Sequence, residues 1–260
     1  MYEDLELVAQ EIERCTVPLF YDDNPAGSGV LVTSDGGRFI LTARHVLEDD
    51  SGQRHGNELT FRLQLDRPQA SVLLPLARVG RVPSLDAAVI DLGAPVPHLG
   101  ELEQLLEASA VPSSTFLSLP PEDPRIRRTS VYIGGFPEER SWSDDAVNLL
   151  ECFVYCTAPP PNEKLWQRAL SASPYMHCAW IPPTGNKHVG SQEPVPAPVL
   201  HGSSGGPWFV VEQHADGPRC RLVAVHSHRV PFRFKGAQHE IAYGIPMLDF
   251  QELLRTRPKD

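Results

Sequence analysis

The chain has 260 residues, 41% of them hydrophobic and 22% charged, values that are ordinary for a globular protein with a buried core. Its net charge of −10 and the lack of a basic run argue against nucleic acid or an anionic membrane as a partner. The acidic N-terminus has no signal-peptide pattern, no stretch is apolar over the ~20 residues of a membrane helix, and the five cysteines are scattered, so we expect a cytoplasmic protein with reduced thiols.

Apolar residues at helical spacing predict one short helix near the N-terminus (5–14) and another near the C-terminus (247–255). Short strand patterns separated by turns fill most of the chain between them. The predicted strands cover 16–21, 29–33, 38–42, 59–65, 70–76 and 86–92, and then 130–133, 148–156, 176–181, 208–211 and 221–227. Ser34-Asp35-Gly36-Gly37 has the composition of a hairpin turn. Strands of this length and spacing along the chain predict an all-β protein with closed antiparallel barrels.

A proline-containing passage at 93–128, with one helical patch at 99–108, separates two strand-rich halves. We therefore expect an N-terminal helix at 1–15, a first β-barrel at 16–112, a second at 113–246 and a C-terminal helix at 247–260. The second half contains a long insertion at 158–200, rich in proline, glycine and polar residues. Loops of this length are usually either functional or disordered, and both interpretations stay open.

Two cysteines in the second half invite comparison with a metal site. Cys152 and Cys156, together with His177 and Cys178, are potential zinc ligands, although their spacing is loose. Residues 150–156 have a strand pattern, and residues four apart on a strand share a face. Two thiols that face the core are the simpler interpretation, and we expect neither a metal nor another cofactor.

The most informative segment is Gly202-Ser203-Ser204-Gly205-Gly206-Pro207. Glycines adopt backbone angles that side chains forbid, so a serine among them can be held outward on a tight turn. Backbone N–H groups of such a turn can bind the oxyanion of an acyl-transfer intermediate. The segment predicts a serine nucleophile, which then needs a base and an acid that orients this base.

His45 is the candidate base, because it follows the apolar strand that ends in Leu41-Thr42-Ala43. An imidazole can accept the serine proton and return it to the leaving group. Asp86, at the start of another apolar strand, is the candidate acid. Asp91 is its rival, but five residues further along a strand it faces the other way. His45, Asp86 and Ser204 then follow one another in the chain order of chymotrypsin.

These segments resemble the trypsin-like serine proteases. The matching motifs are Thr42-Ala43-Arg44-His45, Asp86-Ala87-Ala88-Val89 and Gly202-Ser203-Ser204-Gly205-Gly206-Pro207. Three further segments resemble the bacterial HtrA-type and glutamyl endopeptidases, namely Gly27-Ser28-Gly29, Ile133-Gly134-Gly135-Phe136-Pro137 and Tyr243-Gly244-Ile245-Pro246. Only 14 residues follow Pro246, so we expect a peptidase domain without the PDZ module of HtrA proteases.

The resemblance implies two six-stranded antiparallel β-barrels with the catalytic residues between them. By this resemblance, His45 is the general base, Asp86 orients it and Ser204 is the nucleophile of a serine endopeptidase. The backbone N–H groups of Gly202 and Ser204 form the implied oxyanion hole. Ser203 is a rival nucleophile, but the family pattern places the reactive serine directly before Gly-Gly-Pro.

The chain departs from digestive members of the family at Ser203, where they carry an aspartate that pairs with a new N-terminus after cleavage. A serine forms no ion pair, so we expect another mode of control, such as an activating protein partner acting through the insertion. For specificity, the resemblance assigns the substrate pocket to His226, Ser227, His228 and Arg229, and its cationic groups suggest acidic side chains. Pro198 stands where trypsin carries its aspartate, which argues against a Lys/Arg preference.

Two other functions stay open at this stage. A protease fold with a latent site would act as a binding module, for which the long insertion is the supporting feature. An esterase would share the nucleophile chemistry, although the chain order of the three residues argues against an α/β-hydrolase. Under the leading hypothesis the partner is a protein or peptide substrate.

Overall fold

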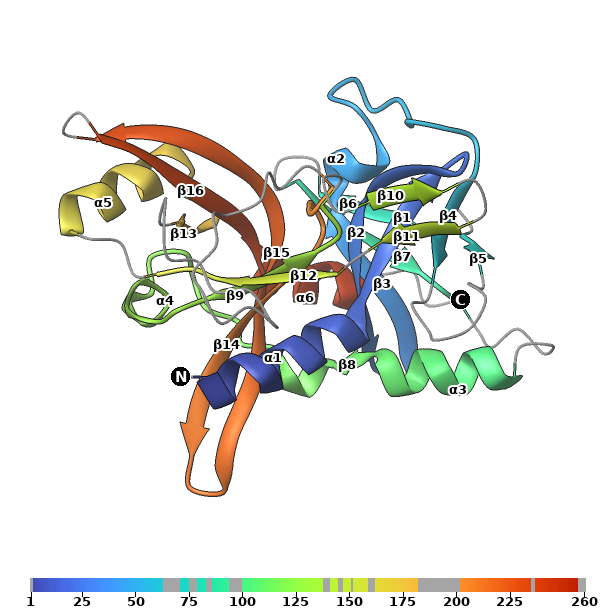
Figure 1. Cartoon of the computed structure of the whole chain (residues 1–260), viewed down its shortest axis with the longest axis horizontal. Helices are drawn as coiled ribbons and strands as arrows, with labels where there is room; N and C mark the ends of the chain where they lie inside the picture. Colours follow the sequence, from blue (N-terminus) through green and yellow to red (C-terminus); the bar gives the residue numbers. More distant parts are fainter. Residues whose placement is uncertain are drawn as a thin grey trace.

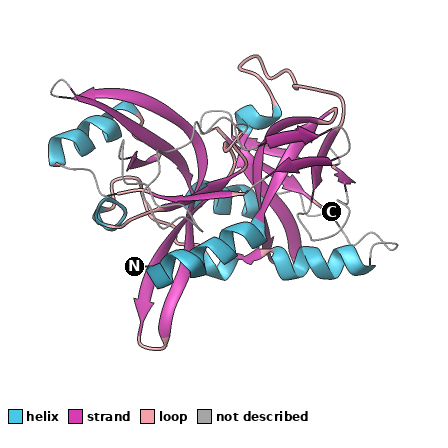
Figure 2. Ribbon diagram, viewed as in Figure 1, coloured by secondary structure: helices cyan, strands magenta, loops and turns pink. Residues whose placement is uncertain are grey.

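The protein consists of two antiparallel β-sheets that lie side by side, with helices at the periphery (Figures 1 and 2). The computed structural model describes residues 2–62, 71–74, 79–82, 86–93, 100–137, 141–144, 147–150, 152–158, 162–181, 202–234 and 237–256. The mostly β architecture with two sheets confirms the predicted fold class.

The first sheet has eight strands and belongs to the N-terminal half of the chain. Its strands run in the order β5-β4-β1-β2-β3-β7-β6, and β8 pairs with β2 in parallel. The strands are β1 (Thr16–Tyr21), β2 (Asn24–Ser34), β3 (Gly37–Ala43), β4 (Leu59–Arg62), β5 (Ser71–Leu73), β6 (Val79–Val82), β7 (Ala87–Asp91) and β8 (Val111–Pro112). The turn predicted at 34–37 joins β2 to β3, with Asp35 and Gly36 at positive φ.

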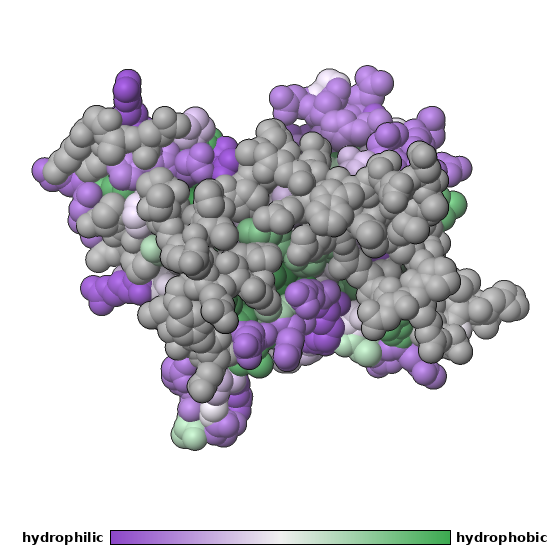
Figure 3. Space-filling view, viewed as in Figure 1, coloured by the Kyte–Doolittle hydropathy of each residue, from purple (hydrophilic) through white to green (hydrophobic). Residues whose placement is uncertain are grey.

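The second sheet has six strands in the order β12-β9-β14-β15-β16-β13. They are β9 (Tyr132–Gly135), β12 (Phe153–Cys156), β13 (His177–Ile181), β14 (Pro207–His214), β15 (Gly217–Phe234) and β16 (Ala237–Pro246). A separate hairpin consists of β10 (Ser141–Asp144) and β11 (Val147–Leu150). The turn between β14 and β15 extends away from the body of the molecule (Figure 1), and most of the surface of this projection is hydrophilic (Figure 3).

The helices are α1 (Tyr2–Cys15), α2 (Arg44–Leu47), α3 (Gly100–Ser109), α4 (Pro124–Arg128), α5 (Glu163–Ala172) and α6 (Met247–Thr256), with a 3-10 turn η3 (Ser113–Thr115). The apolar face of α1 contributes Val8 and Ile12, both 0% exposed, to the larger core cluster. This cluster contains residues of both sheets and of α6, so it joins the two halves, and a second cluster packs the second sheet against α4 and α5. None of the described helices is long and apolar enough to cross a membrane.

Several predicted boundaries were wrong. The strand predicted at 148–156 is two strands, β11 and β12, that pair with different partners. Part of the insertion predicted as a loop at 158–200 is the helix α5, whose N-cap Asn162 accepts a hydrogen bond from the Leu165 N–H at 2.9 Å. The sequence analysis missed β6, β10 and β16, and the first sheet has eight strands where six were expected. Residues 182–201 lie outside the described residues.

Candidate active site

His45 lies on the short helix α2, directly after β3. The last residues of β3 are buried, so the strand fixes where α2 begins. Arg44 donates its backbone N–H to the Asp86 carbonyl at 2.7 Å, and the His55 ring bonds to the carbonyl of His45 at 2.8 Å. The Tyr21 hydroxyl donates to the carbonyl of Leu47, also at 2.8 Å. These bonds hold α2 rigidly while the side chain of His45 stays 40% exposed.

Asp86 holds His45 by two hydrogen bonds. Its Oδ2 lies 2.9 Å from His45 Nδ1, and its Oδ1 accepts the His45 backbone N–H at 3.0 Å. Since an ionised carboxylate only accepts, Nδ1 of His45 carries the hydrogen and Nε2 is left to accept a proton. Burial alone would raise the pKa of Asp86, but the hydrogen bonds from His45 and Ser227 lower it below its ordinary value.

The backbone of Asp86 is unusual. Its φ is +55°, in the left-handed region that aspartate tolerates better than most residues. This conformation turns the chain sharply at the start of β7, whose residues Ala87 and Ala88 are fully buried. Strained backbone of this kind clusters at functional sites. The rival, Asp91, lies at the opposite end of β7, opposite Phe39, and its Oδ1 accepts the Gly93 N–H at 2.8 Å.

Ser227 links Asp86 to the second sheet. Its hydroxyl donates to Asp86 Oδ2 at 2.5 Å, and its side chain is fully buried. His228 Nδ1 lies 2.8 Å from the same hydroxyl oxygen. Because the only hydrogen of this hydroxyl goes to the anionic Asp86, His228 Nδ1 must be the donor in the second bond. The ring of His228 stacks on Tyr243 with centroids 5.1 Å apart.

Ser204 lies in the glycine-rich turn before β14. Its hydroxyl donates to the carbonyl of Ser227 at 2.8 Å, so in this state it points to that carbonyl and not to His45. Gly202 has φ +86°, a backbone angle that favours glycine. Within the described part of the chain, the N–H groups of Gly202 and Ser204 form no hydrogen bond, whereas the Gly205 N–H is bound to His226. Two unused N–H groups beside a serine hydroxyl have the composition of an oxyanion-binding site.

The neighbour Ser203 is less accessible than Ser204. It is 2% exposed, and its Cα, Cβ and Oγ lie against Gly135, where an added Cβ would lie 2.9 Å from the Cα of Ser203. A buried hydroxyl of this kind cannot meet a polypeptide substrate without a change in the turn. The arrangement favours Ser204 as the nucleophile.

The four residues assigned to the substrate pocket differ in accessibility. His226 is 1% exposed, stacks against Trp208 and accepts its indole N–H at 3.3 Å. Burial, together with neighbouring His228, lowers the pKa of His226 to about 3, so this ring is neutral near pH 7. The buried Ser227 binds Asp86, and Arg229 pairs with Glu240 at 2.9 Å. Only His228 is an exposed side chain of this group.

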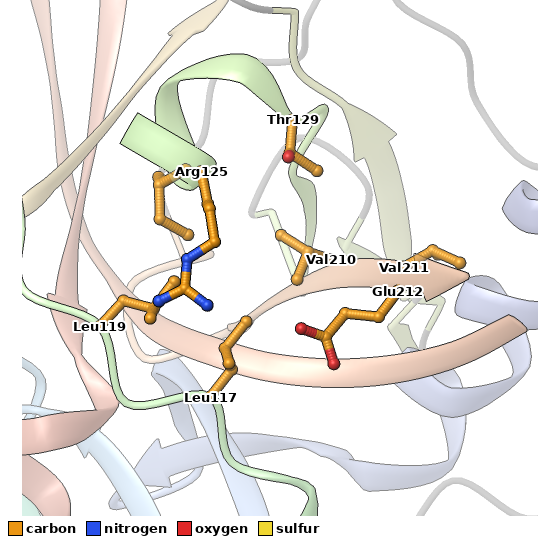
Figure 4. A pocket seen from close by; sticks show the side chains of 8 residues that line it. Leu117, Leu119, Arg125, Thr129, Val210, Val211 and Glu212 are labelled. Carbon is orange, nitrogen blue, oxygen red and sulfur yellow. The ribbon is translucent and has the colours of Figure 1, made fainter. Parts of the chain in front are cut away.

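A cavity of about 170 Å³ lies elsewhere, between α4 and the far end of β14 (Figure 4). Its lining comprises Leu117, Leu119, Arg125, Ile126, Thr129, Val210, Val211 and Glu212. None of His45, Asp86 and Ser204 is among these residues, so this cavity is separate from the candidate active site. None of the cysteines considered as zinc ligands forms a disulfide, and within the described ranges no group of three His, Cys, Asp or Glu side chains is arranged to hold a metal ion.

The chain resembles known proteases in sequence and in fold. Residues 27–215 match the model of the trypsin-like peptidase domain. The structure resembles that of neuropsin, a serine protease expressed in the limbic system of mouse brain, with a TM-score of 0.53 and 18% sequence identity over 94% of each chain. At this identity the likeness concerns the fold alone. A search of curated proteins found no match.

Proposed function

Because the chain belongs to the family of trypsin-like peptidases, we propose that it is a serine endopeptidase that forms an acyl-enzyme on Ser204. The observation that carries this proposal is a set of linked hydrogen bonds, which Ser204 donates to Ser227, Ser227 donates to Asp86, and His45 donates to Asp86. It brings a candidate nucleophile, base and acid from two sheets into one cluster, which supports peptide hydrolysis once the Ser204 hydroxyl turns to His45.

In the proposed mechanism, Oγ of Ser204 attacks the carbonyl carbon of the peptide bond while Nε2 of His45 takes the hydroxyl proton. The carbonyl oxygen becomes an oxyanion, stabilised by the N–H groups of Gly202 and Ser204. The C–N bond then breaks, and His45 returns the proton to the leaving amine. Water, activated by His45, hydrolyses the acyl-enzyme and regenerates Ser204. Asp86 keeps Nδ1 of His45 protonated and stabilises the imidazolium.

Before this reaction the hydroxyl of Ser204 must leave the carbonyl of Ser227, 2.8 Å away, and turn to His45. We expect rotation about χ1 of Ser204 to make this change, because exposed or half-exposed side chains rotate in picoseconds to nanoseconds. The resting orientation therefore supports an enzyme whose nucleophile aligns when substrate binds. A protein that binds the same partner without cleaving it is the second candidate that this orientation favours.

We propose an acidic side-chain preference on the basis of the cationic groups in the segment His226-Ser227-His228-Arg229. The buried, neutral His226 does not supply this charge. Arg229 is the better candidate, because its partner Glu240 is 34% exposed on its side chain and could exchange for a substrate carboxylate. Peptide libraries that vary the residue before the cleaved bond measure this preference, and Arg229→Gln should reduce any selectivity for glutamate or aspartate.

We also propose that a protein partner controls activity. Ser203 occupies the position at which digestive relatives have an aspartate, so we do not propose control by insertion of a newly formed N-terminus. The support is the composition of residues 158–200, since a long proline-, glycine- and polar-rich insertion before the nucleophile favours a regulatory role. Activity of the purified chain alone, equal to its activity in cell extract, would contradict this part of the proposal.

Labelling with a fluorophosphonate probe tests the nucleophile, and mapping of new N-termini in a proteome tests peptide cleavage. Wild type should label and cleave, Ser204→Ala should do neither, and Ser203→Ala should still label. If Ser204→Ala retains labelling, the assignment of the nucleophile is wrong. Labelling with ester hydrolysis but without peptide cleavage would favour an esterase, and binding of a partner without any turnover would favour the binding module.

A further inference from the structure

Ser28 lies where the two sheets meet, and its side chain is 0% exposed. It belongs to β2 of the first sheet, between Gly27 and Gly29. A buried serine in an otherwise apolar core strand needs partners for its hydroxyl group, since an unpaired buried hydroxyl destabilises the fold. The two partners of this hydroxyl, Gly202 and Phe136, both belong to segments that precede or follow a strand of the second sheet.

The hydroxyl of Ser28 forms two hydrogen bonds across the boundary between the sheets. It donates to the carbonyl of Gly202 at 2.9 Å and accepts the backbone N–H of Phe136 at 3.0 Å. The backbone N–H of Ser28 donates to the carbonyl of Ser204 at 2.7 Å. Its own carbonyl accepts the Thr42 hydroxyl at 2.8 Å, which anchors it to the first sheet.

Ser28 thus holds the carbonyls of Gly202 and Ser204, the two residues whose N–H groups have no partner among the described residues. A peptide unit is planar, so the bonds from Ser28 fix the units Gly202–Ser203 and Ser204–Gly205, and the unit that carries the Ser204 N–H lies between these two. Gly202 has φ +86° and, as a glycine, has several backbone conformations of similar energy. Apart from the hydrogen bond from Ser28, no contact among the described residues selects one backbone conformation of Gly202.

The contact between Ser28 and the turn is also close. A Cβ added at Gly205 would lie 1.8 Å from the carbonyl oxygen of Ser28, and one added at Gly27 would lie 2.9 Å from the carbonyl oxygen of Ser204. The turn therefore fits against this part of β2 with no space between them. The hydrogen bonds and the steric fit act on the same few atoms.

We propose that Ser28 is the positioning residue of the oxyanion-binding turn, an inference that rests on the proposed peptidase function. Its neutral, buried hydroxyl fixes the Gly202 carbonyl and its backbone N–H fixes the Ser204 carbonyl, so the two peptide units on either side of the Ser204 N–H are held and the conformation of Gly202 is restricted. Ser203, which lies between them, contributes no ion pair to this purpose. The turn is consequently set by the docking of the two sheets and needs no newly formed N-terminus.

The test compares Ser28→Ala and Ser28→Cys with Thr157→Val. The cysteine keeps the size of the side chain but forms weak hydrogen bonds, so it remains informative if the alanine variant does not fold. Thr157 is a matched control, because its buried hydroxyl also accepts one backbone N–H and donates to one carbonyl, those of Val131 at 3.1 and 3.0 Å. It lies beyond β12, outside the candidate active site.

The first readout is the hydrolysis of p-nitrophenyl acetate and the rate of labelling by a fluorophosphonate. Both Ser28 variants should lower kcat and the labelling rate at least tenfold with KM within twofold, and should stay below the roughly 10²–10³-fold effect of losing one oxyanion donor. Thr157→Val should stay within about threefold of wild type. Ser28 variants at wild-type rates, or an equal loss in Thr157→Val, would overturn the proposal.

The second readout does not depend on activity. In a Ser204→Ala background, hydrogen exchange followed by mass spectrometry should become at least tenfold faster in peptides covering 202–206 and 133–137 when Ser28 is replaced, and should not change there in Thr157→Val. Unchanged exchange in the Ser28 variants would refute the positioning role. If wild type shows no labelling at all, the peptidase function fails, while faster exchange still establishes that Ser28 orders the turn.

Discussion

Ser227 gives its hydroxyl hydrogen to Oδ2 of Asp86, 2.5 Å away, so the carboxylate that holds His45 is itself held from the opposite sheet. The carbonyl of the same residue accepts the hydroxyl of Ser204. Ser227 therefore binds the proposed nucleophile, Ser204, through its carbonyl and the proposed acid, Asp86, through its hydroxyl.

Replacing Ser227 by alanine should lower the rate of labelling by a fluorophosphonate about 10- to 100-fold, because hydrogen bonds to charged groups contribute about 1.5–3 kcal/mol. The bond from Ser227 helps to keep the pKa of Asp86 low. Its loss should raise this pKa, so that the acid limb of the rate–pH profile moves to higher pH. Ser118→Ala, which removes a hydroxyl bonded to Gln251 at 2.7 Å, should leave both rate and profile unchanged.

Asp86→Asn should fold normally but lose about 10⁴-fold in kcat, the order of effect known for this substitution in a serine protease triad. Asparagine tolerates the φ of +55° at this position, whereas most other residues are strained there. Circular dichroism of the purified variant checks that it folds, and kinetics measure the loss in kcat. A variant that retained more than a tenth of wild-type kcat would contradict the role of Asp86.

His177 should make the fold sensitive to acid. Its ring is fully buried, and burial lowers its pKa from 6.5 to about 4. The unfolded chain binds a proton as the pH falls below ~6.5, but the folded chain does so only below about 4, so stability is lost across this interval. The loss should approach about 3 kcal/mol, at 1.36 kcal/mol for each pH unit.

Urea unfolding at several pH values measures this effect. His177→Leu should show a smaller loss of unfolding free energy between pH 6.5 and 4 than wild type. His214→Leu removes a partly exposed imidazole and should retain the wild-type slope. Equal slopes in wild type and His177→Leu would show that this histidine does not govern the acid sensitivity.

Gly205→Ala should prevent the glycine-rich turn from forming. The residue has φ +89°, and its Cβ would lie 1.8 Å from the carbonyl of Ser28 and 2.3 Å from the Thr42 hydroxyl. We expect a loss of more than about 3 kcal/mol in unfolding free energy, together with the loss of labelling. Gly36→Ala is the matched control: φ is +75° there, but nothing lies within 4 Å, so only the backbone strain of ~1–2 kcal/mol should appear.

The sequence predicted the class of fold and the segments of the site, since both depend on local patterns. Short continuous apolar runs mark β2, β3 and β7, and the glycine pattern around Ser204 marks a tight turn. The contacts of Ser28 and Ser227 could not be predicted in this way, because they join backbone groups that are far apart in the chain. His226 shows the same limit: a histidine in a pocket-lining strand suggests a cation, and only its burial against Trp208 reveals a neutral ring.

The predicted boundaries of helices and strands were wrong where the local sequence pattern was ambiguous. The prolines that flank residues 162–172 obscured α5, although Asn162 at its N-cap and the amphipathic pattern after it are typical of a helix start. The run at 148–156 looked like one strand, because a change of pairing partner between β11 and β12 leaves no mark on the alternation of side chains.

The division of the site between two sheets has a consequence for how the protein loses activity. His45 and Asp86 come from the first half, Ser204 and Ser227 from the second. A slight separation breaks the bond from Ser227 to Asp86 that joins the two pairs, while each sheet keeps its own ladder. The rate of the proposed reaction should therefore depend on the contact between the two halves. On heating, turnover should vanish several degrees before far-ultraviolet circular dichroism changes, and ligands that bridge the halves should close that interval.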